Sequence, residues 1–66
     1  MQNNIAAFRK TQGLSQQELA DLIEVSRKTI STVETSRFTP SVIIALKIAK
    51  YFQTSVESLF QLDEDD

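Results

Sequence analysis

The side chains that could do chemistry in this 66-residue sequence are hydrogen-bonding and charged groups, because the chain contains no cysteine and no histidine. This removes disulfides, thiolate and imidazole nucleophiles, the usual zinc ligands and the commonest general base. Serine and threonine hydroxyls are present, but no suitable base accompanies them. The composition therefore argues against an enzyme and predicts no metal and no cofactor, which leaves a binding function.

The polar segment RKTIST at residues 27–32 is a candidate for such binding. A helix from about Arg27 to Glu34 would bury Ile30 and Val33 on one side. The side chains left outward, or near the preceding turn, are Arg27, Lys28, Ser31 and Thr32. The pattern therefore predicts a helix whose exposed face is polar and partly basic.

The net charge of −2 conceals an uneven distribution along the chain. Residues 63–66 hold four of the nine acidic residues, so residues 1–62 carry five acids against seven bases and sum to +2. We interpret residues 63–66 as a frayed, solvated acidic tail. The body of the protein is mildly basic, so the overall charge does not exclude a nucleic acid as partner.

The elements that must position the polar helix are also helices, and the chain is predicted to be a single all-α domain. A first helix runs to about Thr11, and Gly13 ends it in the manner of a C-terminal glycine. Ser15 followed by Glu18 fits a capping box that starts a second helix, which stops near Glu24. Two short helices joined by a tight turn are therefore expected at residues 15–35.

Similar signals place the remaining helices. Ser26 suits the start of the third helix, and a loop over Thr35 to Pro40 separates it from a fourth helix that runs from about Ser41 to Phe52. Ser55 starts a short fifth helix. The expected buried stripe of the fourth helix is Val42, Ala45, Leu46, Ala49 and Phe52, widened by Ile44 and Ile48. The fifth helix is expected to carry Val56, Leu59 and Phe60.

No membrane segment is predicted. The longest apolar run, Val42 to Leu46, is far shorter than the roughly 20 residues that span a bilayer. The N-terminus lacks the pattern of a signal peptide. We therefore expect a cytoplasmic protein.

The segment Gln16 to Thr35, QQELADLIEVSRKTISTVET, resembles the helix-turn-helix of the Cro/C1 (phage repressor) family. Ala20 is small where crossed helices approach closely, and apolar residues recur at 19, 23, 25, 30 and 33. The similarity extends through GLSQQELA, FTPSVIIALKIAK and TSVESLF. It implies a compact five-helix, lambda-repressor-like DNA-binding domain at residues 1–62, with the helix-turn-helix at about 15–35. Small relatives add a short strand at each end, so Phe60 to Asp63 could be extended instead of helical.

The resemblance also implies roles for individual residues. The third helix would lie in the major groove of double-stranded DNA and read base edges with Arg27, Lys28, Ser31 and Thr32. The residues expected to contact phosphates are Ser15, Gln16, Arg37, Thr39 and Ser41. A partly buried salt bridge between Arg9 and Glu34 would fix the orientation of the first and third helices.

Three positions depart from the family's pattern. Glu24 and Gln53 stand where family members often have glycine, and Thr35-Ser36 replaces an Asn-Gly pair. If the backbone still requires a positive φ there, each non-glycine residue costs on the order of 1 kcal/mol. These departures concern the turns and not the fold.

The function that this resemblance implies is a sequence-specific transcriptional regulator. The simplest form is a repressor that binds a palindromic operator as a homodimer, because one short helix reads few base pairs. The apolar candidates for the dimer interface are Val56, Leu59, Phe60 and Leu62, each of which could equally belong to the core. The alternative is a protein-binding module, such as an antitoxin or anti-regulator, that uses the same fold as a scaffold.

Overall fold

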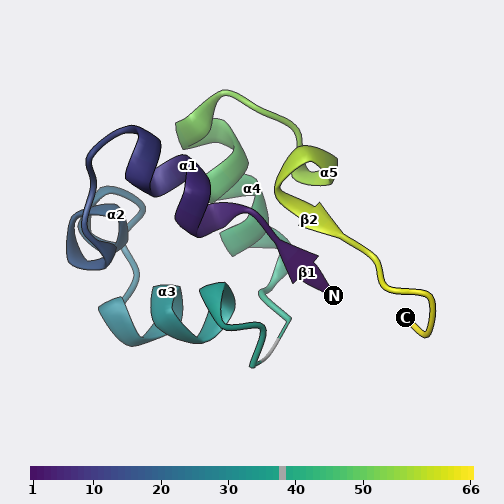
Figure 1. Cartoon of the computed structure of the whole chain (residues 1–66). Coiled ribbons are helices and arrows are strands. Elements are labelled where there is room, and N and C mark those ends of the chain that lie inside the picture. Colours follow the sequence, from purple (N-terminus) through teal and green to yellow (C-terminus); the bar gives the residue numbers. More distant parts are fainter. Residues whose placement is uncertain (38) are drawn as a thin grey trace.

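Five helices surround one apolar core, and two short strands join the two ends of the chain, in the computed structural model, which describes residues 1–37 and 39–66 (Figure 1). The elements are β1 (Gln2–Asn3), α1 (Ile5–Thr11), α2 (Gln16–Leu22), α3 (Arg27–Glu34), α4 (Val42–Phe52), α5 (Val56–Leu59) and β2 (Phe60–Gln61). The predicted five-helix fold is confirmed. The alternative of an extended C-terminal segment is correct at Phe60 and Gln61, so the placement of Phe60 in the fifth helix is wrong.

Serine residues determine where four of the helices begin. Ser15, Ser26, Ser41 and Ser55 each have an extended backbone, and each side chain accepts a hydrogen bond from the amide three residues later. At α2 the predicted capping box is complete, because Glu18 also accepts the backbone N–H of Ser15 at 2.8 Å. This backbone hydrogen bond lowers the pKa of Glu18. The helix starts therefore follow from contacts within four residues.

Four turns have the same backbone conformation and hydrogen-bond pattern. Glu24, Ser36 and Gln53 have φ values of 61°, 58° and 54°, and Gly13 has a φ of 70°. After each of them, the next residue donates its amide to the carbonyl five positions earlier: Leu14 to Arg9, Val25 to Ala20, Arg37 to Thr32 and Thr54 to Ala49. This hydrogen bond closes the end of a helix and requires a left-handed residue. The three departures from glycine thus occur at positions with a positive φ.

The core draws side chains from all five helices. Fully or nearly fully buried apolar residues are Ile5, Leu19, Ala20, Ile23, Ile30, Val33, Ala45, Ile48, Ala49, Phe52 and Leu59. Phe8 of α1 packs against Phe52 of α4 with their ring centroids 5.5 Å apart. Because this core includes Ile30 and Val33, it fixes which side of α3 faces outward.

The expected buried stripe of α4 is wrong at its N-terminal half. Val42 and Leu46 are 74% and 55% exposed, and Ile43 is 68% exposed. The core contacts α4 on the side that carries Ala45, Ile48, Ala49 and Phe52. Val42 and Leu46 lie at the edge of that side, so the spacing alone could not show that they remain outside.

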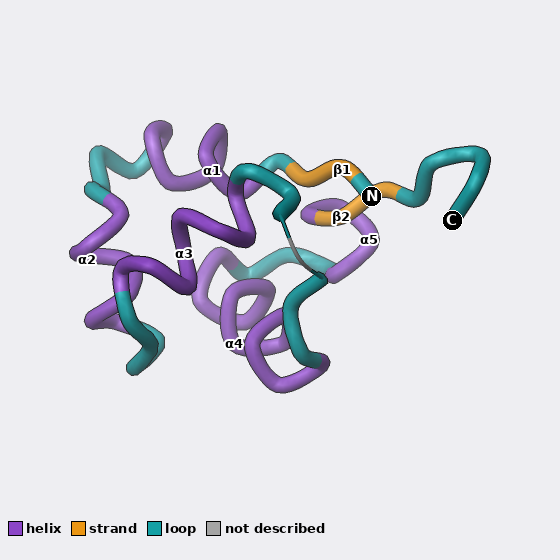
Figure 2. Tube along the Cα trace, turned by 90° about the horizontal axis from the view of Figure 1, so that it is seen from below, coloured by secondary structure: helices purple, strands orange, loops and turns teal. Residues whose placement is uncertain are grey.

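The two ends of the chain meet. β1 and β2 pair antiparallel with Gln2 opposite Gln61, next to α5 (Figure 2). The terminal amino group of Met1 contacts the carboxylates of Asp63 at 2.7 Å and Asp66 at 3.1 Å. These hydrogen bonds raise the pKa of the amino group. The interpretation of residues 63–66 as a freely solvated tail is therefore wrong for these two aspartates.

Within the described part of the chain, no helix has the length and apolarity needed to cross a bilayer.

Candidate nucleic-acid interface

The unit formed by α2, the turn at residues 23–26 and α3 controls how the polar helix is presented. α2 packs directly against α3, with Ala20 fully buried. Val25 is half-buried against the core, and Glu24 beside it adopts the left-handed backbone of the turn. The small side chain of Ala20 allows the two helix backbones to approach closely. α3 therefore lies on the surface with one side held in the core.

The outward side of α3 brings the four predicted base-reading residues together. Arg27 and Lys28 are exposed in the first turn, and Ser31 and Thr32 follow half-buried one turn later. The Thr32 hydroxyl donates to the Lys28 carbonyl at 2.9 Å. Its methyl group and oxygen lone pairs are left for contacts outside the helix. This face offers two exposed cations and two short polar side chains.

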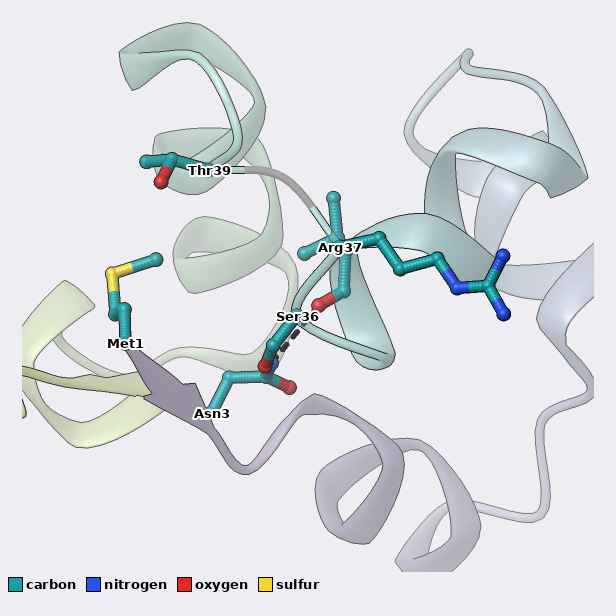
Figure 3. Close-up of a pocket in the computed structure, with 6 residues that line it drawn as sticks. Met1, Asn3, Ser36, Arg37 and Thr39 are labelled. Carbon is teal, nitrogen blue, oxygen red and sulfur yellow. Dashed lines mark hydrogen bonds between the residues drawn. The ribbon is translucent and has the colours of Figure 1, made fainter.

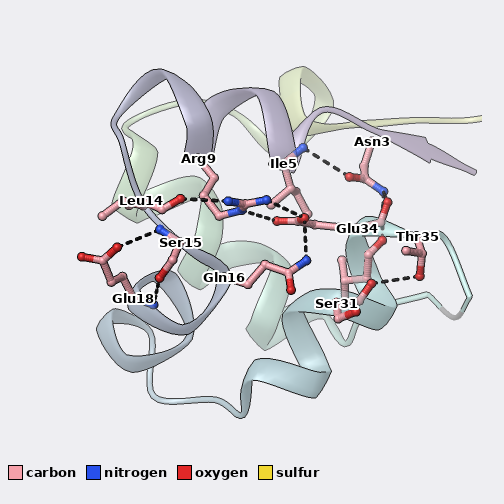
Figure 4. Close-up of polar contacts among 11 residues, drawn as sticks. Asn3, Ile5, Arg9, Leu14, Ser15, Gln16, Glu18, Ser31, Glu34 and Thr35 are labelled. Atoms are coloured by element: carbon pink, nitrogen blue, oxygen red, sulfur yellow. Dashed lines mark hydrogen bonds and ion pairs between the residues drawn. The ribbon is translucent and has the colours of Figure 1, made fainter.

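A partly buried polar network anchors the other end of α3 (Figure 4). Arg9 donates through Nε and Nη2 to the two carboxylate oxygens of Glu34, at 2.8 and 3.1 Å, and through Nη1 to the Leu14 carbonyl at 2.8 Å. The Arg9 and Glu34 side chains are only 11% and 6% exposed. Such a two-point contact fixes geometry as well as charge. It joins α1 and the loop after it to the last residue of α3.

Gln16 belongs to the same network, because its Nε2 donates to Glu34 Oε1 at 3.1 Å. The phosphate contact expected for Gln16 remains a prediction, and within the protein one of its amide protons is donated to Glu34. The second amide proton and the carbonyl oxygen remain. Gln16 thus links the start of α2 to the end of α3.

The network stabilises the charged forms of both Arg9 and Glu34. Burial would raise the pKa of Glu34, but the hydrogen bonds from Arg9 and Gln16 and the charge of Arg9 outweigh it. The pKa of Glu34 therefore lies below its ordinary 4.5, and the hydrogen bond to Glu34 raises the pKa of Arg9. Because Glu34 is neutralised internally, the free charges of residues 26–37 are those of Arg27, Lys28 and Arg37.

The remaining phosphate candidates fall into two groups. Ser15 and Ser41 are helix caps whose oxygens accept the amides of Glu18 and Ile44. Each hydroxyl proton is still able to point outward to an anion. Arg37 and Thr39 are exposed.

Arg37 and Thr39 line a pocket of about 190 Å³ beside the end of α3. The other lining residues are Met1, Asn3, Val33 and Ser36. In Figure 3 the guanidinium of Arg37 extends away from Met1, Asn3 and Thr39. The Arg37 charge therefore lies at the surface of the molecule and not inside the pocket.

Asn3 is a positioning residue that sequence analysis missed. Its Nδ2 donates to the Val33 carbonyl at 2.9 Å and lies 3.4 Å from the Ser36 hydroxyl, so it caps the C-terminal end of α3 from β1. Its Oδ1 accepts the amide of Ile5. The contacts with α3 span about thirty positions, and no local pattern could have revealed them.

These features together define a helix-turn-helix domain, in which α2 and α3 are the two helices of the motif. The sequence matches the family described as "Helix-turn-helix" over residues 5–59. The chain therefore belongs to the Cro/C1-type helix-turn-helix family of transcriptional regulators, whose members are DNA-binding proteins and not enzymes.

Relatives span the whole chain. A helix-turn-helix type transcriptional regulator of Methanothermobacter thermautotrophicus is 42% identical, with 98% of this chain and 96% of the relative covered. The regulator MJ0272 of Methanocaldococcus jannaschii is 36% identical over the full length of both chains. The regulator YgzD of Bacillus subtilis is 35% identical, also over the full length of both.

Two solved structures share the fold. The restriction-modification controller protein C.AhdI from Aeromonas hydrophila has a TM-score of 0.77 at 30% identity, with 85% of each chain covered. The N-terminal DNA-binding domain of SinR from Bacillus subtilis has a TM-score of 0.78 at 28% identity, with 91% of this chain and 88% of the other covered.

Proposed function

We propose that this DNA-binding regulator is a cytoplasmic repressor that binds a palindromic operator as a homodimer. The observation that carries the proposal is the outward side of α3, where Arg27 and Lys28 are exposed and the nearby acid, Glu34, is neutralised by Arg9. A protein that occupies its operator in this way excludes other proteins from the same stretch of DNA.

Base reading is assigned to the first two turns of α3. Arg27 can donate two hydrogen bonds to guanine O6 and N7, and Lys28 can donate to the same edge less rigidly. Ser31 and Thr32 would meet base edges or a thymine methyl one turn later.

Phosphate contacts are assigned to the flanking segments. Ser15 and Gln16 at the start of α2 would lie against one strand, and Arg37, Thr39 and Ser41 after α3 against the backbone on the other side. These contacts position the domain and carry no sequence information.

The homodimer follows from the size of the reading surface. One eight-residue helix contacts few base pairs, and a two-fold dimer doubles the contacts at half-sites about 34–36 Å apart. Leu59 cannot take part in the interface because it is 0% exposed. Val56 and Phe60 are half-buried against their own core, which leaves Leu62, at 79% exposure, from the original set of interface candidates.

Selection of bound sequences from random duplex DNA tests the proposal. The expected result is a recovered palindrome whose half-sites are about one helical turn apart. An Arg27→Ala variant taken through the same selection should lose preference at one base pair of each half-site. Recovery of no common sequence would contradict operator recognition and favour the protein-binding module.

A further inference from the structure

Asn3 joins β1 to the C-terminal end of α3. The last four carbonyl groups of a helix have no partner within the helix. In α3, the Val33 carbonyl accepts Asn3 Nδ2 at 2.9 Å and also the amide of Ser36 at 3.1 Å. The same Nδ2 lies 3.5 Å from the Glu34 carbonyl and 3.4 Å from the Ser36 hydroxyl. One side chain thus contacts both the last turn of α3 and the turn that follows it.

The Asn3 side chain is held in the orientation that these contacts require. Its Oδ1 accepts the amide of Ile5 at 3.2 Å, so the Nδ2 end of the carboxamide faces α3. The backbone of β1 is fixed as well, because it pairs with β2 and the Asn4 amide donates to the Leu59 carbonyl at 2.8 Å. Ile5 and Leu59 are fully buried. Asn3 therefore connects the end of α3 to a backbone that is anchored in the core.

The turn that Asn3 contacts determines how Arg37 leaves the helix. Ser36 has a φ of 58°, a left-handed conformation that residues other than glycine adopt rarely. Arg37 comes next, and its amide donates to the Thr32 carbonyl at 3.0 Å. Its side chain is exposed, and the guanidinium extends away from Asn3 (Figure 3). The direction of the Arg37 side chain therefore depends on the backbone conformation at Ser36.

We propose that Asn3 is a positioning residue for DNA binding, which fixes the turn at Ser36 and thereby directs Arg37 to the DNA phosphates. The inference rests on the proposed phosphate contact of Arg37 and adds to it a residue from outside the helix-turn-helix. A long side chain binds more tightly when the backbone that carries it is already ordered, because less conformational entropy is lost on binding. The contact with the Ser36 hydroxyl is one that glycine, the residue of the family pattern at this position, could not make.

A double-mutant cycle between Asn3 and Arg37 tests the proposal on scrambled duplex DNA, where phosphate contacts act without base reading. We expect Asn3→Ala to weaken binding by about 5-fold, the effect of one net hydrogen bond, and to have no further effect in an Arg37→Ala background. Asn4→Ala is the matched control, because Asn4 is also a carboxamide but donates to the Ser58 carbonyl of α5 at 3.1 Å. It should change the affinity little in either background.

Two further measurements separate positioning from a general loss of stability. Losing one phosphate contact lowers the salt slope of binding by about 1, so the slope should fall in Arg37→Ala and in Asn3→Ala but not in Asn4→Ala. In the free protein, hydrogen exchange of the Ser36 and Arg37 amides should accelerate about 5-fold in Asn3→Ala. Thermal melting of each variant gives a temperature at which it is folded for the titrations. If Asn3→Ala does not fold, Ser36→Ala removes the contact from the other side and should show the same lack of additivity with Arg37→Ala.

The outcomes separate this inference from the proposed function. Additive losses for Asn3→Ala and Arg37→Ala, or an Asn3→Ala protein that binds scrambled duplex as tightly as wild type, would overturn the positioning role. Unchanged affinity in Arg37→Ala would also overturn it and would leave base reading by α3 intact. A wild-type protein that selects no DNA sequence would refute the operator proposal, and coupling between Asn3 and Arg37 on scrambled duplex would still support the positioning role.

Discussion

The outward sides of α3 and of the N-terminal half of α4 are both surfaces of amphipathic helices packed on one core, yet they have opposite chemistry. α3 presents Arg27 and Lys28, and α4 presents the exposed apolar side chains of Val42, Ile43 and Leu46. Residues 35–41 are all that separate the two helices along the chain.

The support behind the two helices differs as well. Both ends of α3 are fixed by polar contacts, with the Ser26 cap at the start and with Asn3 and the Arg9–Glu34–Gln16 network at the end. α4 also begins with a serine cap, Ser41, but apart from the Lys47 hydrogen bond to the Ile23 carbonyl its contacts with the core are the apolar packing of Ala45, Ile48, Ala49 and Phe52. Hydrogen bonds are directional and fix the orientation of a helix accurately, whereas apolar packing constrains the orientation less. The comparison therefore separates a polar helix side held by directional contacts from an apolar helix side that is exposed.

The largest expected effect comes from removing the support of α3. Glu34→Ala leaves the partly buried Arg9 without its carboxylate partner and should lower the free energy of unfolding by up to about 3 kcal/mol, because breaking one side of an ion pair shielded from solvent is costly. Denaturant unfolding measures it. Glu18→Ala removes an exposed carboxylate from a helix cap and should cost less than about 1 kcal/mol. Equal losses in the two variants would mean that the network does not hold α3.

The next effect concerns the DNA-reading side itself. Arg27→Ala should weaken binding to the selected operator by about 1–3 kcal/mol and change binding to scrambled duplex little, because base contacts carry the sequence information. Titrations on both DNAs measure the difference.

Gln16→Ala is the control for Arg27→Ala, since a phosphate contact affects both DNAs by similar factors and a neutral residue barely changes the salt dependence. Because Gln16 also donates a hydrogen bond to Glu34, the melting temperature of the Gln16→Ala variant must first be compared with that of wild type. Undiminished operator preference in Arg27→Ala would remove this residue from the recognition surface.

A smaller effect distinguishes the turn before α3 from the core. Glu24 has a φ of 61°, so Glu24→Gly should raise the free energy of unfolding by a few tenths to about 1 kcal/mol, as relief of strain exceeds the added entropy of the unfolded chain. Thermal unfolding of Glu24→Gly and of Glu24→Ala, which keeps a Cβ, measures it. A lower midpoint for the glycine variant would contradict strain at this turn.

The smallest expected effect is the pH dependence of the network. The pKa of Glu34 is lower in the folded protein than its ordinary 4.5, so the unfolded chain binds a proton first as the pH falls. Glu34 therefore contributes stability that is complete above the unfolded pKa and is lost as the pH falls through the folded pKa. Urea midpoints measured from neutral to acidic pH should fall more steeply for wild type than for Glu34→Gln. Parallel profiles would show that Glu34 does not couple folding to protons here.

Local sequence determined most of the elements. Ser15, Ser26, Ser41 and Ser55 start helices through hydrogen bonds that span three residues, so their positions could be predicted without knowing the fold. The resemblance raised a positive φ at Glu24 as a condition, because family members often have glycine at this position, and Glu24 has a φ of 61°. The polar side of α3 was also predictable, because the spacing of Ile30 and Val33 alone identifies the buried side of the helix.

Tertiary structure decided which apolar residues are covered and which polar groups meet. The spacing of Val42 and Leu46 fits a buried stripe, but both side chains are mostly exposed, whereas Leu59 is fully buried in the core. Asn3 reaches Val33 across thirty positions, and Met1 reaches Asp63 across sixty-two. Periodicity records only where a side chain points around its own helix. Whether another part of the protein covers that side depends on the packing of the whole chain, which leaves Val42, Ile43 and Leu46 exposed.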